Sequence, residues 1–350
     1  MTETLFIKTI QDGQQVEGVF LLKELIRAET KGGKPFLTVK LMDKTGEVTG
    51  RIWDEADRWE QECSPGQAVG ISGRAQSYKG NLQLVITEVR GMSASEIDLA
   101  QFIPSTSGDI DRMAEELTDL ARGVADVFIK KLLLKFFTDQ EFMTKFKKGP
   151  AAKSMHHAYL GGLLEHTLHV AQLADKVTEL YPSINRSLLL AGAMLHDVGK
   201  VEELAITSTL FDYSDQGRLM GHMVIGVEMV QEKIARIKDF PQDLAVKIKH
   251  LILSHHGSHE FGSPTLPMLH EAFVLNFLDD LDAKTNYLER LSAQIPENEY
   301  RWSEYQRNLE RFLFLSGHAT QSREEETPPA KKKKTATDQD VRQPSLFDSL

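Results

Sequence analysis

The spacing of apolar residues changes near residue 100, and this change constrains the fold more than any other feature of the chain. Before it, short runs alternate between apolar and polar residues, as half-buried β-strands do. After it, apolar residues recur at helical spacing as far as about residue 316. A chain of 350 residues is long enough for two such domains and a tail.

The first region is expected to contain five strands, several of them separated by turns that contain glycine. A short helix, Glu55–Glu62, falls between the third and fourth strands. Five strands with a helix after the third is the order of an OB-fold, so residues 1–100 are expected to form a five-stranded OB-fold β-barrel. The expected strands are Val16–Ile26, Pro35–Asp43, Val48–Trp53, Ala68–Gln76 and Leu82–Arg90.

A barrel of this kind binds single-stranded nucleic acid through a basic groove and through aromatic side chains that stack on bases. Phe36 and Trp53 are equally compatible with the core of a small barrel. Residues 1–100 hold 12 Lys and Arg against 15 Asp and Glu, and the whole chain has a net charge of -10, so any basic surface must be local. Such binding should weaken as salt is added. The candidate residues are Lys34, Phe36, Arg51, Trp53, Arg74, Tyr78 and Lys79.

The rest of the chain predicts a linker with a helical connection over residues 101–150, an all-α domain over 151–318 and a disordered tail over 319–350. The tail is predicted from its acidic, proline and lysine runs, which have no apolar periodicity. The expected helices are Met113–Phe137, Tyr159–Tyr181, Arg186–His196, Leu219–Ile237, Asp243–Ser254 and Leu269–Leu288.

Several histidines and aspartates fall on or beside separate predicted helices, and helical bundles build metal sites where helices converge. The pair His196-Asp197 follows the apolar run Leu188–Leu195, so both residues are expected to be buried. A buried aspartate must be paired or bound to a metal, and an imidazole beside a carboxylate offers two ligands for a divalent cation. The full set is His166, His196, Asp197, His222, His255, His256 and Asp279.

Lys200 follows the His196-Asp197 pair at a spacing that places it on their helical face. We expect its ammonium group to contact a substrate phosphate or to neutralise negative charge that develops on it. Asp197 and Lys200 are therefore the predicted catalytic residues.

The order of His166, His196-Asp197 and Asp279 resembles the HD superfamily of metal-dependent phosphohydrolases. His222 and the His255-His256 doublet resemble the branch that binds two metal ions. This resemblance implies in-line attack of water on phosphorus, with the ions stabilising the attacking and leaving oxygens. It implies that Asp197 bridges the ions, that His166, His196 and Asp279 hold one of them, and that His222, His255 and His256 hold the other.

Asp280 competes with Asp279 for the last ligand position. The segment Leu278–Asp282 has an additional aspartate, and it has leucine where the HD pattern usually has alanine. The sequence leaves this choice open.

A closer resemblance lies in Lys153–His166, His196–Lys200, Gly221-His222, His255–Gly257 and Phe261–Pro264. With the OB-like region before them, these segments resemble the YhaM-type 3′–5′ exoribonucleases over about residues 5–315. The resemblance implies removal of 5′-mononucleotides from the 3′ end of single-stranded RNA, with single-stranded DNA as a further substrate. It also implies divalent metal ions, manganese first and cobalt, iron or magnesium as alternatives.

Other functions stay open at this stage. The chain could be an HD-type nucleotide phosphohydrolase, or a noncatalytic adaptor that binds nucleic acid through the barrel. Cleavage of cyclic dinucleotides is disfavoured because the Gly-Tyr-Pro element of that HD branch is missing after His255-His256. Metal content separates an adaptor from an enzyme, and product analysis separates an exonuclease from a nucleotidase.

The end of the tail has Gln343, Leu346 and Phe347 at the spacing Gln-x-x-Leu-Phe. This resembles the short peptide with which bacterial replication proteins dock on the sliding clamp, and such a short match is as compatible with chance. The single cysteine, Cys63, excludes a disulfide within the chain. No run approaches a membrane span, and the first residues lack the apolar core of a signal peptide, so a cytoplasmic protein with no membrane partner is expected.

Overall fold

A computed structural model describes residues 5–30, 32–78, 81–92, 102, 104–153, 156–207 and 210–317. The chain divides into two compact units, of which the first ends at Glu289 and the second begins at Arg290. The first unit contains a β-barrel and a helical region, and the second contains a short β-hairpin. Each of these parts is described by itself.

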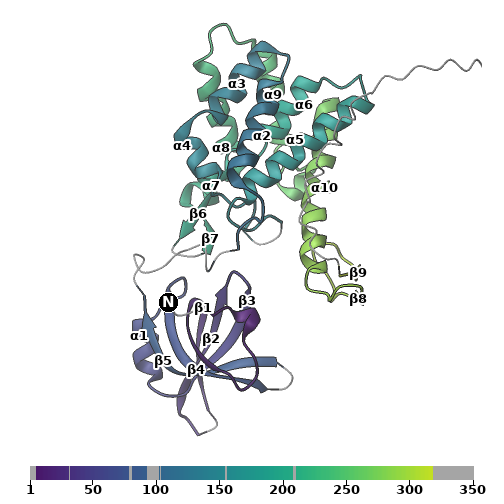
Figure 1. The fold of residues 1–350 in the computed structure, drawn as a ribbon. Coiled ribbons are helices and arrows are strands. Elements are labelled where there is room, and N and C mark those ends of the chain that lie inside the picture. The colour runs from purple at the N-terminus through teal and green to yellow at the C-terminus, as the bar shows by residue number, and fades with distance from the viewer. Residues whose placement is uncertain are drawn as a thin grey trace, which may run out of the picture. The chain divides into compact units, whose positions relative to one another are not determined.

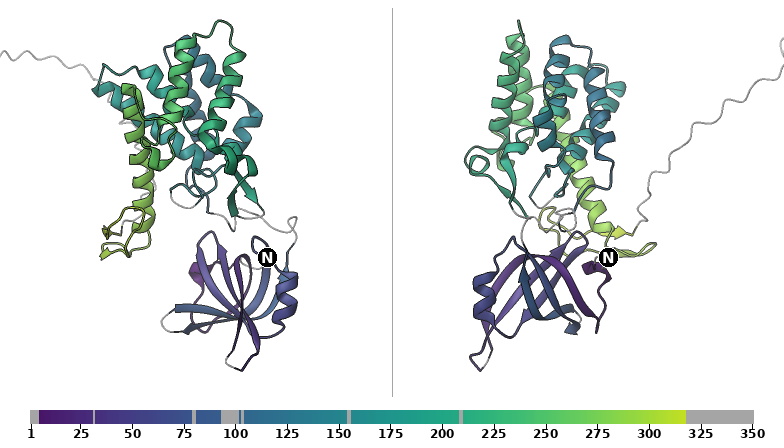
Figure 2. Two further views of the ribbon diagram at one scale, coloured as in Figure 1. Left: turned by 180° about the vertical axis from the view of Figure 1, so that it is seen from behind. Right: turned by 60° about the vertical axis from the view of Figure 1, so that its left-hand side comes forward.

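The N-terminal barrel is closed, with the strand order β1-β2-β3-β5-β4 (Figure 1). Strands β3 and β5 pair in parallel, and all other neighbours pair antiparallel. Helix α1, Ala56–Glu62, follows the third strand and lies beside the strands (Figure 2). The expectation of a five-stranded OB-fold is therefore confirmed. The strands are β1 (Gln15–Glu29), β2 (Pro35–Asp43), β3 (Gly46–Ile52), β4 (Ala68–Tyr78) and β5 (Asn81–Gly91).

Alternation along the strands builds the barrel core. In β2, every second residue from Leu37 to Asp43 is buried, which places Leu37, Val39 and Leu41 inside. Phe20 from β1 and Leu84 from β5 are fully buried beside them. Each such side chain contributes about 1.5–3 kcal/mol by leaving water. The side chains that alternate with them on the same strands face outward.

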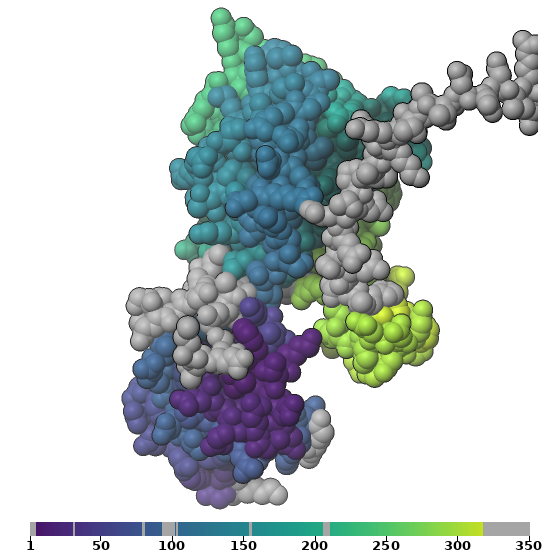
Figure 3. Space-filling view, in the orientation of Figure 1, coloured from purple at the N-terminus to yellow at the C-terminus, as the bar shows by residue number. Residues whose placement is uncertain are grey.

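The helical region has one continuous core, to which the described helices from α2 to α10 contribute. In the space-filling view, α2 to α4 form an unbroken face of this region (blue in Figure 3). The helices are α2 (Ile110–Arg122), α3 (Val127–Phe137), α4 (Gln140–Phe146), α5 (Gly162–Leu180), α6 (Arg186–Leu195), α7 (Lys200–Glu203), α8 (Asp215–Ala235), α9 (Gln242–Ser254) and α10 (His270–Ser292).

The prediction of one helix over Met113–Phe137 is wrong, because the chain breaks there between α2 and α3. The Asp126 side chain accepts hydrogen bonds from the backbone N–H groups of Phe128 and Ile129, and so caps a new helix. Apolar residues continue at helical spacing across the break, which hides it from a periodicity argument. The helix α4, which begins in the same way at Asp139, was not predicted either.

Two short hairpins interrupt or follow the helices and were not predicted. Strands β6 (Leu204–Thr207) and β7 (Leu210–Tyr213) pair between α7 and α8. In the second unit, β8 (Tyr300–Trp302) pairs with β9 (Phe314–Ser316). Strands this short hold too few residues to show an alternating pattern.

The limits of the predicted domains stay predictions. Within the predicted connection, residues 101–150, helices α2 to α4 pack into the same core as the later helices. The predicted disordered tail, residues 319–350, lies outside the described residues. Among the helices that the structure describes, none is both long and apolar enough to cross a membrane.

Candidate metal centre and nucleic-acid surface

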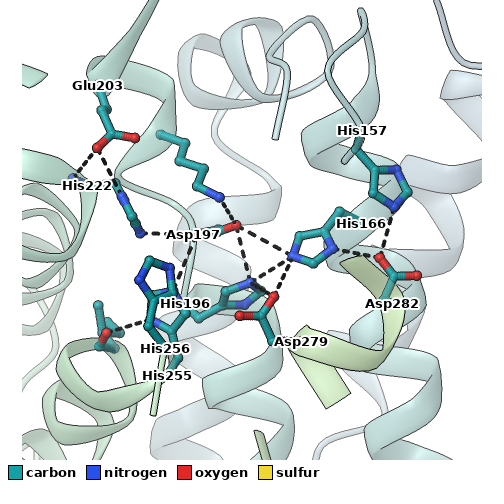
Figure 4. A network of polar contacts seen from close by, with 12 residues as sticks. His157, His166, His196, Asp197, Glu203, His222, His255, His256, Asp279 and Asp282 are labelled. Atoms are coloured by element: carbon teal, nitrogen blue, oxygen red, sulfur yellow. Dashed lines mark hydrogen bonds and ion pairs between the residues drawn. The ribbon is translucent and has the colours of Figure 1, made fainter. Parts of the chain in front are cut away.

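The predicted histidines and aspartates come together in the helical region (Figure 4). They arrive from five elements: α5, the end of α6, α8, the end of α9, and α10. Their side-chain atoms gather around Asp197, which is 2% exposed. The residues of this cluster, which we call the central cluster, are His166, His196, Asp197, His222, His255, His256 and Asp279.

The local sequence explains why Asp197 lies at the centre. Helix α6 is buried along Leu188–Leu195, and it ends at His196, which adopts the C-cap position. The chain therefore delivers His196 and Asp197 into the interior directly after an apolar helix. Lys200 offsets the buried charge, since its Nζ lies 2.7 Å from Asp197 Oδ2. An unpaired carboxylate at this depth would be strongly unfavourable.

One group of donors surrounds Asp197 Oδ2. The Nε2 atoms of His166 and His196 lie 3.1 Å apart, and they lie 3.5 and 3.3 Å from this oxygen. Asp279 Oδ1 lies 3.1 Å from His166 Nε2 and 3.9 Å from His196 Nε2. We call His166, His196 and Asp279 the first group.

A second group faces the other oxygen of the same carboxylate. The Nε2 atoms of His222 and His255 lie 3.5 and 3.7 Å from Asp197 Oδ1. His222, His255 and His256 each offer a ring nitrogen within 4.8 Å of the others. We call these three histidines the second group. Asp197 thus presents one oxygen to each group.

Three buried atoms where Asp197 meets the second group have no hydrogen-bond partner among the residues that the structure describes. These atoms are Asp197 Oδ1, His222 Nε2 and His255 Nε2. Leaving a polar atom buried and unsatisfied costs about 1–3 kcal/mol each. A divalent cation would satisfy all three, and imidazole with carboxylate is a donor set that suits transition metals. The residues therefore fit a metal ion.

The ring orientations of three histidines follow from backbone carbonyls. Nδ1 of His196 lies 2.9 Å from the Ala193 oxygen, and Nδ1 of His255 lies 2.7 Å from the Ile252 oxygen. His256 Nδ1 lies 2.7 Å from a third carbonyl oxygen, further along the chain. A carbonyl oxygen can only accept, so each Nδ1 carries the hydrogen. In each ring, Nε2 is then the nitrogen left to bind a metal.

The protonation states also suit metal binding. Burial alone would raise the pKa of Asp197, but Lys200 and the neighbouring imidazoles hold it well below its ordinary value. Burial would likewise raise the pKa of Asp279, and the hydrogen bond from His166 outweighs this and lowers it. Burial lowers the pKa of His255 well below its ordinary range. The aspartates are therefore ionised and His255 is neutral, the forms in which these side chains bind metals.

His166 differs from His255, because carboxylates outnumber cations around it. Burial lowers its pKa, but hydrogen bonds to Asp279 and Asp282 outweigh burial and raise the pKa to about 10. The environment of this ring therefore favours positive charge. A divalent cation bound at the same position would supply that positive charge.

The structure separates the two aspartates between which the sequence could not choose. Asp279 points into the central cluster, with its side chain 14% exposed. Asp280 lies on the outer face of α10, half exposed and paired with Lys284 at 2.7 Å. Of the two, only Asp279 reaches the histidines.

Of the predicted nucleic-acid residues, those that the structure describes lie on the outer surface of the barrel. Phe36 and Trp53 stack with ring centroids 4.7 Å apart, and the Arg51 guanidinium lies 5.5 Å above the Phe36 ring. Trp53 is 39% exposed, and neither aromatic residue belongs to the buried barrel core. Lys34 is exposed directly before β2, two residues before Phe36, and pairs with Asp54 at 2.8 Å.

Arg74 shares a face of the sheet with Arg51. Arg51 on β3 and Arg74 on β4 both pair with Val85 on β5, and residues paired across strands point to the same side. Tyr78 is exposed further along β4. The remaining candidate, Lys79, lies outside the described residues. The structure therefore assembles a surface with two arginines and stacked rings from residues distant in sequence.

Comparison with known proteins decides the family. Residues 163–284 match the HD domain family, and residues 15–90 match the family described as OB-fold nucleic acid binding domain. The protein named 3′-5′ exoribonuclease YhaM in Oceanobacillus iheyensis is 33% identical over 290 residues, which are 82% of this chain and 90% of that protein. The chain belongs to the YhaM family. YhaM proteins of Listeria innocua and Bacillus subtilis are 35% and 32% identical over 294 and 289 residues, in each case 82% of this chain and 91% of the relative.

Three further side chains of this YhaM-family chain support the central cluster and were missed in the sequence. Asp282 and His157 lie behind His166, and Glu203 lies behind His222 (Figure 4). Asp282 follows Asp279 by one helical turn and so shares its face, which is a signal that the sequence did contain. Nothing in the spacing of His157 or Glu203 indicates their positions.

His156 also approaches the cluster, since its ring lies 5.4 Å from that of His166. Burial lowers its pKa to about 3, with Lys200 and His166 adding to the effect, so the ring is neutral at pH 7.

Proposed function

We propose that this YhaM-family chain is a metal-dependent 3′–5′ exoribonuclease, which hydrolyses single-stranded RNA and releases 5′-mononucleotides. The observation that carries the proposal is the buried carboxylate of Asp197, which presents one oxygen to each of two groups of histidines. The curated relatives are named 3′-5′ exoribonucleases and align over most of their length. Single-stranded DNA is a further substrate of the same chemistry.

Two divalent ions would occupy the central cluster, with Asp197 as the shared ligand. The first group would hold one ion and the second group the other. Manganese is the expected metal, because several imidazoles favour a transition metal over magnesium or calcium; cobalt and iron are alternatives, and magnesium is a weaker one. When bound, such a pair stabilises the attacking and leaving oxygens of an in-line displacement.

The reaction consumes one water for each nucleotide released. The water oxygen bonds to the phosphorus of the last phosphodiester, and the bond from phosphorus to the 3′ oxygen of the preceding nucleotide breaks. That 3′ oxygen takes up a proton, which leaves a shortened strand with a 3′ hydroxyl and a free 5′-mononucleotide.

Lys200 and Asp197 are the residues of this chain that we assign to catalysis. Burial lowers the pKa of Lys200, but the adjacent Asp197 outweighs it and keeps the ammonium protonated. A phosphate that enters the cluster would meet this positive charge within reach of Asp197. His166, His196 and His255 have no exposed surface, so electrostatic interactions in the central cluster are correspondingly strong.

The outer surface of the barrel would hold the single strand. Phe36 and Trp53 would stack on bases, while Lys34, Arg51, Arg74 and Lys79 contact phosphates and Tyr78 adds a further ring. The chain is acidic overall, with a net charge of -10, so affinity would depend on this local surface and fall with added salt. A flat response to salt would contradict binding through phosphates.

The tail residues Gln343, Leu346 and Phe347 would dock on a bacterial sliding clamp, which would bring the enzyme to DNA intermediates. The motif Gln-x-x-Leu-Phe is the support for this proposal. A variant with Leu346→Ala and Phe347→Ala should lose capture by immobilised clamp, and unchanged capture would eliminate the idea. The single cysteine, Cys63, is buried and free, which suits the reducing cytoplasm in which we place the protein.

The direct test is incubation with manganese of a 5′-labelled single-stranded RNA and its DNA counterpart. We expect a ladder of shortened products from the wild-type protein and none from Asp197→Ala. Absence of shortening on either strand would favour the two alternatives, a nucleotide phosphohydrolase or a noncatalytic adaptor. Hydrolysis of free nucleotides would then distinguish those two.

A further inference from the structure

Two buried carboxylates, Asp282 and Glu203, each contact one histidine of the central cluster from behind. We infer that both are positioning residues. Asp282 orients His166 of the first group, and Glu203 orients His222 of the second group. The inference rests on the proposed two-ion function. It predicts that the binding of each ion can be weakened independently by substituting a residue that is not itself a metal ligand.

Asp282 is shared by three imidazoles. Its Oδ2 lies 2.7 Å from His166 Nδ1 and 2.9 Å from His157 Nε2, and its Oδ1 lies 3.1 Å from His169 Nδ1. The side chain is 8% exposed. A carboxylate only accepts, so His166 Nδ1 carries a hydrogen, and this bond holds the ring with its Nε2 toward the central cluster (Figure 4).

A fixed network holds Asp282 in place. The backbone N–H of His157 donates to Asn286 Oδ1 at 2.9 Å, and Asn286 Nδ2 donates to the Tyr159 hydroxyl at 3.0 Å. The Tyr159 hydroxyl lies 2.8 Å from His157 Nδ1, to which it donates because Nε2 carries the hydrogen. Asp282 and Asn286 lie one turn apart on α10, on the helix face that also carries Asp279. The ring of His157 therefore cannot turn without breaking several bonds.

Glu203 performs the corresponding task at the second group. Its Oε1 accepts from both the backbone N–H and the Nδ1–H of His222, at 2.9 and 3.0 Å. The backbone N–H is available because Gly221 interrupts α8, with φ 73° and ψ 155°. Glu203 thus caps the helix that restarts after the break, and it directs the Nε2 lone pair of His222 toward Asp197.

The other three histidines of the cluster use backbone carbonyls for the same purpose. Each group therefore contains one histidine whose Nδ1–H meets a negative charge. A carboxylate in this position fixes the ring and raises the basicity of the metal-binding nitrogen, and its loss costs about 10- to 100-fold in metal affinity. This difference between the histidine bonded to a carboxylate and the histidines bonded to carbonyls assigns one carboxylate to each group.

The test measures manganese binding to the full-length protein, for which the signal of free Mn²⁺ in electron paramagnetic resonance is a direct readout. Asp282→Asn and Glu203→Gln should each raise one of the two manganese dissociation constants by about 10- to 100-fold and leave the other unchanged. Matched controls are the neighbouring Asp280→Asn and Glu202→Gln. Both control side chains are exposed and paired with lysines, so their variants should bind like the wild type.

Ligand variants identify which group each carboxylate serves. In a His166→Ala background, binding is left to the second group, so adding Asp282→Asn should change the remaining constant by less than about twofold. Adding Glu203→Gln to the same background should raise the remaining dissociation constant by about 10- to 100-fold. In a His222→Ala background the two effects should exchange.

Several results would overturn the inference. One is that Asp282→Asn and Glu203→Gln bind manganese like their controls, and another is that each variant weakens both ions equally. Thermal unfolding of the metal-free proteins checks that each variant is folded. If Asp282→Asn unfolds at a lower temperature, Asp282→Glu provides a second test, because it retains the carboxylate and should bind manganese more tightly than Asp282→Asn. Wild-type protein that binds fewer than two ions would refute the proposed function as well, whereas failure confined to the variants would refute the inference alone.

Discussion

Replacing Gly199 by alanine tests whether the close approach of α7 and α8 holds the central cluster together. Gly199 lies between Asp197 and Lys200, and its φ of -67° is one that any residue adopts. A Cβ added there would lie 2.0 Å from the His222 carbonyl oxygen and 2.7 Å from the Gly226 amide nitrogen. Glycine is therefore required at this position for space and not for conformation.

The size of the effect follows from these distances. Ordinary contact with a Cβ begins at 3.4 Å, so the backbone at His222 must move by about 1.4 Å away from the new Cβ at position 199. Backbone shifts forced by an added methyl group cost about 1–3 kcal/mol in the free energy of unfolding. A displacement of about 1 Å at a reacting centre can reduce the rate about 100-fold. Gly199→Ala should therefore lose both stability and activity.

Gly226→Ala is the matched control, because it adds the same methyl group from the opposite side of the same contact. Its Cβ would meet Gly199 N at 3.5 Å and Ile252 Cγ2 at 3.6 Å, which are ordinary contacts. Inside α8, alanine should stabilise the helix by up to about 1 kcal/mol. Urea unfolding gives the stabilities and shortening of labelled RNA gives the rates. If Gly199→Ala matched Gly226→Ala in both, the packing argument would be refuted.

Three further predictions concern other parts of the molecule. Lys200→Met should reduce kcat by about 100-fold at saturating manganese, since it removes a positive charge beside the phosphate, and full turnover would exclude Lys200 from catalysis. The hydrogen bond from Lys233 lowers the pKa of Asp139, so this carboxylate stabilises the fold above about pH 4 and loses that effect as pH falls through its folded pKa. Asp139→Asn still caps α4, and in urea unfolding it should cost about 0.5–1 kcal/mol at pH 7 and progressively less as the pH falls below about 4, so a cost that does not change with pH would contradict the ion pair. Trp53→Ala should weaken binding of single-stranded RNA by about 1–3 kcal/mol in fluorescence titrations, and unchanged affinity would remove Trp53 from the binding surface.

The sequence was sufficient for the barrel and for most helices, because burial imposes a period on each. In β2 the alternating pattern predicts a strand over Pro35–Asp43, and the structure gives the strand the same bounds. The apolar run before His196 correctly predicts a buried helix that ends at a polar pair. Such patterns are local, and local patterns can be read directly.

The missed features depend on contacts between distant residues. The break between α2 and α3 depends on the side chain of Asp126, which looks like any other aspartate within a helical pattern. Glu203 was missed because its partner, His222, becomes its neighbour only after Gly221 interrupts α8. His157 reaches Asp282 across 125 positions of the chain. Spacing cannot reveal these pairs, because only the packed helices bring them together.

The choice between Asp279 and Asp280 needs both the sequence and the structure. Their positions on α10 differ by one residue, or about 100° around the helix. That rotation sends one carboxylate to His166 and the other to Lys284 at the surface. The sequence contains both candidates, and only the direction of the buried face distinguishes them.

The most direct test of the central claim compares one single-stranded RNA labelled at its 3′ end with the same RNA labelled at its 5′ end, in the presence of manganese. A 3′–5′ exonuclease predicts labelled mononucleotide at the earliest times from the 3′ label, and a descending ladder from the 5′ label. Both signals should disappear with Asp197→Ala or with excess chelator. Mononucleotide appearing first from the 5′ label, or shortening that persists in Asp197→Ala, would contradict the account.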